Sequence, residues 1–291
     1  MKMKKVLLFL CLMVGSLVAK PIIAVSIPMQ AEFIEKIAGE EYDISVLVEK
    51  GTNPHDFEPK FSSIKEVNEA IAYFPIGVEF EASWLKRFLD QNPNMKVFPS
   101  NAGIKTINFA HHSKDEHEHH EHHEHHEHGE HGDTHIWLSV ANAKQIATNI
   151  YKALVELNPK GDYSKAYEAL LNQIQQTDTQ IKAALKDVPK HQKFVVFHPM
   201  LGYFAKEYDL EEISIEVEGK SPKMKEMMQV IDTIKKENLQ IIFAQPEFST
   251  KAAEFIAKES GAKLGYFSPL ETPWAENLIR FAEALKEANK N

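Results

Sequence analysis

Short apolar runs alternate with segments of helical periodicity along the first part of the chain. Runs rich in isoleucine and valine predict buried parallel strands, because such strands are covered on both faces of their sheet. After the first run, Phe33, Ile34 and Ile37 recur at helical spacing and Gly39 follows, which predicts a helix ending near the glycine. The predicted strands cover residues 21–28, 44–51, 71–77 and 96–100, and the predicted helices cover residues 29–41 and 62–70.

The same alternation returns in the last third of the chain. Strands are predicted at residues 193–198, 213–219, 239–245 and 262–268, and helices at residues 200–208, 221–238, 249–260 and 275–290. Strand and helix in succession indicate an α/β unit built on a parallel sheet. The chain therefore contains two such units, one on each side of its central segment.

The central segment is predicted to be helical. Residues 136–157 form one amphipathic helix, and a break at residues 158–161 separates it from a second, longer one with a narrow apolar stripe. A helix with so thin a stripe either spans two lobes or lies on the surface of one domain. We predict an α/β fold of two lobes with parallel sheets joined by a long helix. The boundaries are residues 20–161 for the N-terminal lobe, 162–188 for the linking helix and 189–291 for the C-terminal lobe.

One tract contains no apolar residue. From His112 to Gly132 every side chain is polar or absent, so the tract cannot bury a face and is predicted to be a loop without a fold of its own. Imidazole is a leading ligand for zinc, copper and nickel. We expect accessory metal contacts here, although a solvated acidic loop without ligands has the same composition. The candidate ligands are His111, His112, His117, His119, His120, His122, His123, His125, His126, His128 and His131.

The first nineteen residues have the pattern of a signal peptide. Three lysines precede an apolar run at residues 6–18, which is short for a membrane span, and Ala19 offers a small residue for cleavage. An uncleaved N-terminal anchor is the alternative. The single cysteine, Cys11, lies inside this run, so the mature protein is expected to have no disulfide and no thiolate ligand. A metal site must then use nitrogen and oxygen.

Composition narrows the class of partner. The chain has 291 residues, 43% of them hydrophobic and 26% charged, which is typical of a globular protein with a core. Its formal net charge of −9 argues against nucleic acid as a partner and favours the attraction of cations.

Four histidines lie outside the tract, and three of them fall where a cleft between two lobes would have its ligands. His55 lies in a proline-bounded loop after a predicted strand, His198 ends a predicted strand, and His135 begins a predicted helix. Open α/β sheets bind ligands at the carboxyl ends of their strands. Three nitrogens plus a water or an oxygen suit tetrahedral zinc. The fourth histidine, His191, has polar neighbours and is assigned to the surface.

These segments resemble a known family, the periplasmic zinc-binding proteins of bacterial zinc ABC importers, within the wider group of zinc and manganese solute-binding proteins. The resemblance covers essentially the whole mature chain. It implies two α/β lobes, a long rigid linking helix and one metal ion between the lobes, with His55, His135 and His198 as ligands. The segments that carry it are the acidic His-rich loop and residues 53–59 (NPHDFEP), 133–138 (DTHIWL), 197–204 (FHPMLGYF) and 242–248 (IFAQPEF).

The chain departs from the family pattern at several positions. Ser268 stands where many relatives have an aspartate as fourth ligand, and Pro54 stands where some have a glutamate. Water is therefore the first expectation for the fourth ligand and Glu247 the second. The usual Glu-Pro-Gln appears as Gln245-Pro246-Glu247, which is expected to alter the surroundings of the site. Glu81 matches a recurring glutamate and is expected to be a structural group or to support the metal ligands, without being a ligand itself.

The resemblance implies capture of Zn²⁺ in the periplasm and its delivery to the membrane permease of an ABC transporter, without catalysis and with a monomer as the default state. Three imidazoles without a carboxylate favour zinc over manganese, which prefers oxygen donors. The alternatives are a protein for manganese or another divalent metal, a His-rich zinc buffer and a zinc hydrolase, although no HExxH pairing is found. An adhesin-like role, known for some relatives, is not required by any residue.

Overall fold

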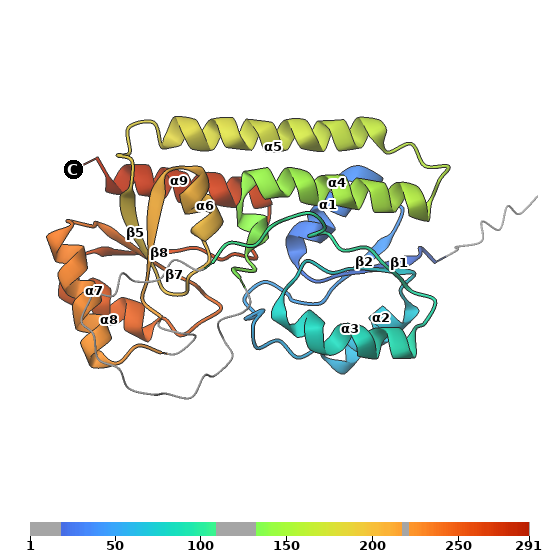
Figure 1. Cartoon of the computed structure of the whole chain (residues 1–291), viewed down its shortest axis with the longest axis horizontal. Coiled ribbons are helices and arrows are strands. Elements are labelled where there is room, and N and C mark those ends of the chain that lie inside the picture. Colours follow the sequence, from blue (N-terminus) through green and yellow to red (C-terminus); the bar gives the residue numbers. More distant parts are fainter. Residues whose placement is uncertain (1–18, 109–131, 217–220, 291) are drawn as a thin grey trace, which may run out of the picture.

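Two four-stranded parallel sheets form the two halves of the molecule (Figure 1), in a computed structural model that describes residues 19–108, 132–216 and 221–290. The first sheet has the order β2 (Asp43–Val46), β1 (Ile22–Val25), β3 (Ala72–Phe74), β4 (Lys96–Val97). The second has the order β6 (Leu210–Ser214), β5 (Gln192–Val196), β7 (Ile241–Ala244), β8 (Lys263–Tyr266). The two sheets thus share one topology, and the predicted two-lobed α/β fold is confirmed.

The apolar runs lie at the centre of each sheet, as predicted. In β1, Ile23 pairs in parallel register with Ile44 on one side and Ala72 on the other, and its side chain is fully buried. In β5, Val195 is likewise buried and pairs with Ile213 and Ile242. In both sheets, loops follow the carboxyl ends of the central strands. Open α/β sheets commonly bind their ligands at these ends.

Helices pack around both sheets and also join them. The helices of the first lobe are α1 (Pro28–Ala38), α2 (Phe61–Glu69) and α3 (Glu79–Gln91), and those of the second are α6 (Gly202–Glu207), α7 (Met224–Lys236), α8 (Lys251–Ser260) and α9 (Trp274–Ala288). Between them come α4 (Val140–Leu157) and α5 (Ser164–Ala184). Helix α5 contacts α1 and α4 as well as α9, and Figure 1 shows it lying along both halves. The exact domain boundaries at residues 161 and 188 stay predictions.

Three elements differ from the prediction. Helix α3 was not predicted, although Phe80, Trp84 and Phe88 recur at a spacing of four residues. The helix expected over residues 136–157 is divided, because Ile136–Leu138 form a 3₁₀ turn and Ser139 caps α4 by accepting a hydrogen bond from Asn142 N. Strand β6 begins at Leu210, three residues before the predicted start, and pairs with β5. The prediction started too late because the glutamates early in this strand interrupt its hydrophobic pattern.

Two predictions fall on residues outside the described ranges: most of the signal peptide with Cys11, and the histidine tract from His111 to His131. Across residues 19–108, 132–216 and 221–290, no helix combines the length and apolar character needed to span a bilayer.

Candidate metal centre

Three histidines that are far apart in the sequence meet between the two lobes. His55, His135 and His198 each offer one ring nitrogen, and these nitrogens lie within 4.8 Å of one another. Their ring centroids are 5.1 Å apart for His55 and His135, 4.6 Å for His55 and His198, and 5.3 Å for His135 and His198. The three positions singled out in the sequence therefore form one cluster. Within the described part of the chain, it is the only such cluster of possible metal ligands.

The chain delivers each histidine by a different local structure. His55 lies in the loop between β2 and α2, where its backbone N–H donates to the Asn53 side chain at 3.0 Å. His135 directly precedes the 3₁₀ turn before α4. His198 follows β5 by two residues, so it lies at the carboxyl end of a central strand. One candidate ligand comes from the loop after β2, one from the segment leading into α4 and one from the end of β5.

Each imidazole has a carboxylate at its Nδ1 atom. Glu79 Oε2 lies 3.0 Å from Nδ1 of His55, and Asp133 Oδ1 lies 2.8 Å from Nδ1 of His135. The third carboxylate, from Glu216, lies 2.6 Å from its histidine nitrogen. A carboxylate can only accept a hydrogen bond, so in the neutral rings of His135 and His198 Nδ1 carries the hydrogen and Nε2 keeps its lone pair. The contact between His55 and Glu79 is a close charge contact, because Glu79 Oε2 has no hydrogen-bond partner among the described residues.

The free nitrogens are also withdrawn from water. Nε2 of His55 and Nε2 of His198 are buried and have no hydrogen-bond partner among the described residues. The side chain of His135 is 1% exposed. Buried polar atoms without a partner are rare in folded proteins and call for an explanation such as an ion. The donor set of three neutral imidazoles fits Zn²⁺, which binds histidine nitrogen in tetrahedral sites.

Burial and charge shift the pKa values of the site in opposite directions. Burial lowers the pKa of His198 to about 4, against the opposing effect of Glu216. Burial also acts to lower the pKa of His55, but the nearby Glu79 carboxylate outweighs it and the pKa is raised. Burial acts to raise the pKa of Glu79, but His55 outweighs it and lowers the value to about 2. His198 is therefore held neutral, whereas His55 is the imidazole that protonates more readily.

The other residues singled out in the sequence lie outside the cluster. Glu247 and Ser268 contact each other through a hydrogen bond from the serine hydroxyl to the carboxylate. Glu81 is buried and accepts hydrogen bonds from Ser26 Oγ and from the backbone N–H groups that precede α3, so it is structural as predicted. The His191 side chain is 72% exposed, which confirms its surface assignment.

Four residues of the site were not recognised as such from the sequence. Glu79, Asp133 and Glu216 orient the imidazoles, and Gln245, noted only as a departure from the family pattern, binds the backbone of His198 at both its N–H and its carbonyl group. Asp133 alone carried a local signal, since it precedes its histidine by two residues. Glu79 begins helix α3 and Glu216 follows strand β6, so only the fold brings them to their partners.

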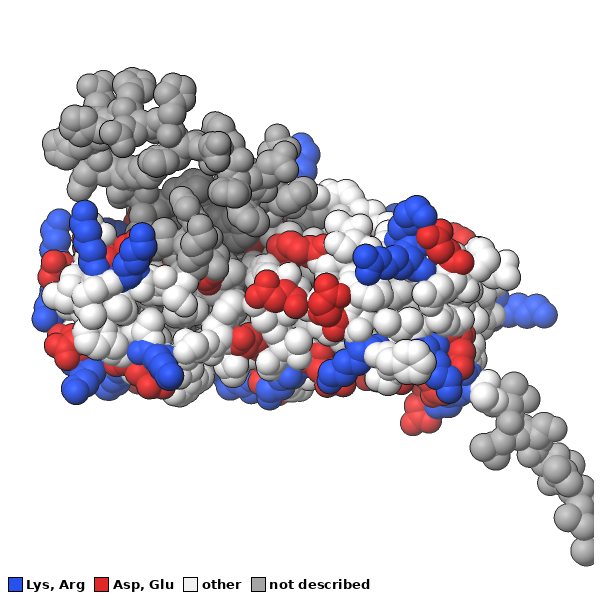
Figure 2. All heavy atoms as spheres, turned by 90° about the horizontal axis from the view of Figure 1, so that it is seen from below, with Lys and Arg blue, Asp and Glu red and all other residues white. Residues whose placement is uncertain are grey.

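The distribution of charge on the surface favours the attraction of cations. Figure 2 shows that acidic residues gather near the middle of the face seen from below, while many lysines and arginines lie toward the two ends of the molecule. A concentration of negative charge raises the local concentration of cations.

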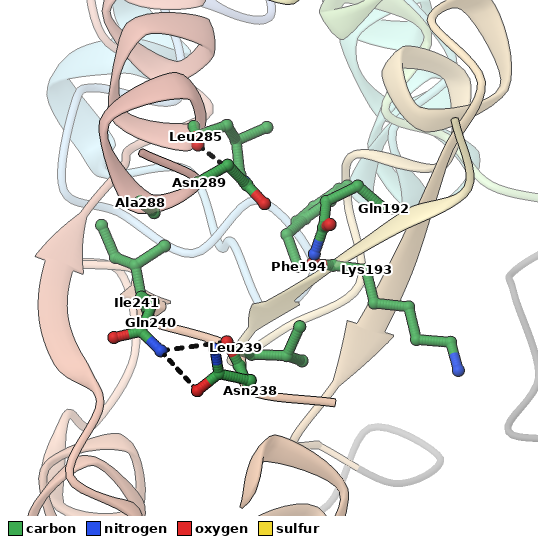
Figure 3. A pocket seen from close by; sticks show the side chains of 10 residues that line it. All are labelled: Gln192, Lys193, Phe194, Asn238, Leu239, Gln240, Ile241, Leu285, Ala288 and Asn289. Atoms are coloured by element: carbon green, nitrogen blue, oxygen red, sulfur yellow. Dashed lines mark hydrogen bonds between the residues drawn. The ribbon is translucent and has the colours of Figure 1, made fainter. Parts of the chain in front are cut away.

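A separate cavity is lined by residues of β5, β7 and α9 and of the segment that precedes β7 (Figure 3). It has a volume of about 20 Å³ and lies at the amino ends of β5 and β7, next to the end of α9. Its lining includes Gln192, Asn238, Gln240 and Asn289 but no histidine or carboxylate. It is large enough for a water molecule and has no metal ligands.

Comparison with known proteins agrees with this geometry. Residues 23–288 match the family model described as zinc-uptake complex component A, periplasmic. The chain is 32% identical over 251 residues to the zinc-binding protein AdcA of Streptococcus pyogenes, covering 82% of this chain and 48% of that relative. It is 30% identical over 247 residues to the high-affinity zinc uptake system protein ZnuA of Bacillus subtilis, covering 82% and 75% of the two chains.

A solved structure shows the same fold. The crystal structure of a ZnuA protein superimposes with a TM-score of 0.83 at 37% sequence identity, covering 93% of this chain and 100% of the other. The chain spans about half the length of the AdcA relatives that it matches. The family match extends over nearly all described residues of both lobes, and the chain therefore belongs to the family of periplasmic zinc-uptake components.

Proposed function

We propose that this chain is the zinc-binding component of an ABC importer, which captures Zn²⁺ and passes it to a membrane permease. The observation that carries the proposal is the cluster of His55, His135 and His198, whose ligand atoms lie within 4.8 Å of one another between two α/β lobes. Family membership and the zinc-binding names of the relatives support zinc as the ion. The carboxylates at each Nδ1 support a site that is organised before the ion arrives.

The donor set favours zinc over manganese. Manganese prefers several oxygen donors, whereas no carboxylate joins the three imidazoles in the cluster formed by the described residues. The candidate carboxylate, Glu247, lies outside this cluster; its Oε1 accepts a hydrogen bond from Ser268, and its buried Oε2 has no hydrogen-bond partner among the described residues. A water molecule as the fourth ligand completes a tetrahedral site.

The arrangement also favours binding over hydrolysis. A zinc hydrolase needs a carboxylate or imidazole free to act as general base beside the metal-bound water. The carboxylates of Glu79, Asp133 and Glu216 are each engaged by a ligand histidine. The chain therefore has the features of a carrier site, in which the ion itself is the cargo.

The histidine tract is proposed to assist capture. Its eleven imidazoles between His111 and His131 can hold Zn²⁺ weakly at several places and raise its concentration near the tight site. The N-terminal segment with its apolar run is proposed to direct the chain to the periplasm, in keeping with the periplasmic family.

Transport measured in a reconstituted system tests the proposal. The chain would be added to proteoliposomes that contain the permease and ATPase of a zinc importer from the same source, and uptake of radioactive zinc would be followed. We expect ATP-dependent uptake that requires the chain and that is lost when His55, His135 and His198 are replaced by alanine. Uptake that is the same with the triple variant would contradict the proposal.

A further inference from the structure

The side chain of Gln245 holds the backbone of His198 on both sides. The backbone N–H of His198 donates to Gln245 Oε1 at 2.9 Å, and Gln245 Nε2 donates to the carbonyl oxygen of His198 at 2.7 Å. Nε2 also lies 3.2 Å from the sulfur of Met200. Gln245 is 1% exposed. These contacts use both ends of one amide, and only a side chain that donates and accepts can make them.

The sequence explains why a side chain takes this role. Strands β5 and β7 pair up to Val196 and Phe243, and the ladder continues as Phe197 N donates to the carbonyl oxygen of Phe243 at 3.0 Å. Strand β7 then ends at Ala244, and Pro246 has no N–H with which to continue a ladder. The Gln245 amide acts in place of the missing peptide group. It extends the pairing to the residue that carries the ligand.

The imidazole ring is held from the same turn. The ring of Phe248, three residues after Gln245, stacks on the ring of His198 with centroids 4.7 Å apart and an interplanar angle of 20°. Glu216 fixes Nδ1 at 2.6 Å. Backbone and ring are therefore constrained separately, by Gln245 for the first and by Phe248 and Glu216 for the second.

Comparison with His55 shows what the two hydrogen bonds from Gln245 to the His198 backbone add. The His55 backbone is held by the side chain of Asn53, which is two residues away in the same loop. Its side chain is 19% exposed, against 10% for His198. His198 is thus the ligand anchored by a distant element of the sheet. We propose that Gln245 is a positioning residue for metal binding, which fixes His198 so that its Nε2 points into the site; this rests on the proposed function.

Two substitutions test whether the hydrogen bonds from Gln245 position His198. Gln245→Glu keeps the shape but loses the donor to the His198 carbonyl oxygen when ionised, and Gln245→Met keeps the length but loses both hydrogen bonds. Gln229→Glu, which makes the same charge change at an exposed position of α7 in the same lobe, is the matched control. All variants are made in the Asn-tract chain, defined as the full chain with the eleven histidines between His111 and His131 replaced by asparagine. Zinc affinity is measured by competition with a chelator at a temperature where every variant is folded.

We expect both Gln245 variants to bind zinc about 10- to 100-fold more weakly than the parent, the range typical of residues that orient metal ligands. Gln229→Glu is expected to leave the affinity unchanged. The decisive comparison uses two further backgrounds. Gln245→Glu should still weaken binding when His55 is replaced by alanine. It should have no effect on the residual affinity when His198 is replaced by alanine, because no ring is left to position.

The outcomes separate this proposal from the function on which it rests. Equal losses in the His55→Ala and His198→Ala backgrounds would mean that Gln245 supports the fold in general and would overturn the positioning role. An affinity equal to that of the parent would overturn it as well, while the three-histidine site would stand. A parent chain without a tight site that depends on the three histidines would overturn the proposed function instead.

Discussion

The indole N–H of Trp274 donates to the backbone carbonyl oxygen of Trp137 at 2.7 Å. The Trp137 indole in turn donates to the carbonyl oxygen of Pro269 at 2.8 Å, and both indoles are buried. Trp137 lies two residues after His135, whereas Trp274 begins α9 of the second lobe. The segment that contains His135, one of the three candidate ligands, is therefore hydrogen-bonded directly to the C-terminal helix.

This relationship predicts the effect of Trp274→Phe. The substitution leaves the buried carbonyl oxygen of Trp137 without its donor, so the free energy of unfolding should fall by about 1–3 kcal/mol. Trp84→Phe is the control, because the Trp84 indole donates to Glu58 at the surface and its loss should cost less than about 1 kcal/mol. Denaturant unfolding of the metal-free chain measures both. Equal decreases in the free energy of unfolding for the two variants would contradict a larger contribution from the buried hydrogen bond.

A second prediction concerns the proton that competes with zinc. The pKa of His55 is raised because the Glu79 carboxylate outweighs burial, and the proton must leave before zinc binds. Zinc affinity should therefore fall as the pH drops through this raised pKa. His198, with a pKa of about 4, should not contribute until the pH is far lower.

Glu79→Gln tests this assignment. It should lower the pKa of His55, shift the loss of affinity to lower pH, and weaken binding about 10-fold or more at neutral pH because the ring loses its negatively charged partner. NMR titration of the imidazoles and zinc competition across pH measure the two effects. Glu69→Gln, at an exposed position of α2, is the control. An unchanged His55 titration would refute the role of Glu79.

A third prediction links stability to Glu212. Burial, with a contribution from the Asp133 carboxylate, raises the pKa of Glu212 to about 7, although Met200 N and Leu201 N donate to it. The folded chain thus holds a proton on Glu212 that the unfolded chain has lost. The free energy of unfolding should fall as the pH rises from about 5 to 7, by on the order of 1–3 kcal/mol given partial contact with solvent.

Glu212→Gln should remove this dependence, because the amide oxygen can still accept from the two backbone N–H groups and carries no charge. The variant should be more stable than the parent at pH 8 and similar at pH 5. Glu211→Gln changes the same charge on an exposed neighbour and should leave the slope in place. Thermal unfolding of the metal-free chains at several pH values decides the matter. Parallel curves for parent and Glu212→Gln would contradict the assignment.

A fourth prediction separates the tract from the tight site. Calorimetry of the full chain should show one tight zinc ion and several weak ones, because isolated clusters of imidazole bind metal without a fixed geometry. The Asn-tract chain should lose the weak ions and keep the tight affinity within a few-fold. If the tight ion disappears with the tract histidines, the tract and not the lobes holds the transported metal.

Much of this architecture could be predicted, because short stretches of neighbouring residues in the sequence indicate its strands and helices. The runs around Ile23 and Val195 indicated central strands, and proximity to strand ends singled out His55 and His198. Helix α3 could also have been found, since Phe80 and Phe88 mark its buried face.

The partners of the ligands could not be predicted from local patterns. Glu216 reaches His198 from the end of β6, and Gln245 reaches it from the end of β7, so both contacts exist only after the sheet has formed. Glu79 is separated from His55 by a whole helix and strand. Hydrophobic periodicity carries no information about which polar residues of different loops face each other.

The central claim is that three histidines from different parts of the fold form one tight zinc site. The most direct test is competition titration of Zn²⁺ with two proteins: the Asn-tract chain, and the same chain with His55→Ala, His135→Ala and His198→Ala. We predict one tight site in the first protein and none in the second, with both chains folded by circular dichroism. The claim is contradicted if the first protein has no tight site or if the second retains it.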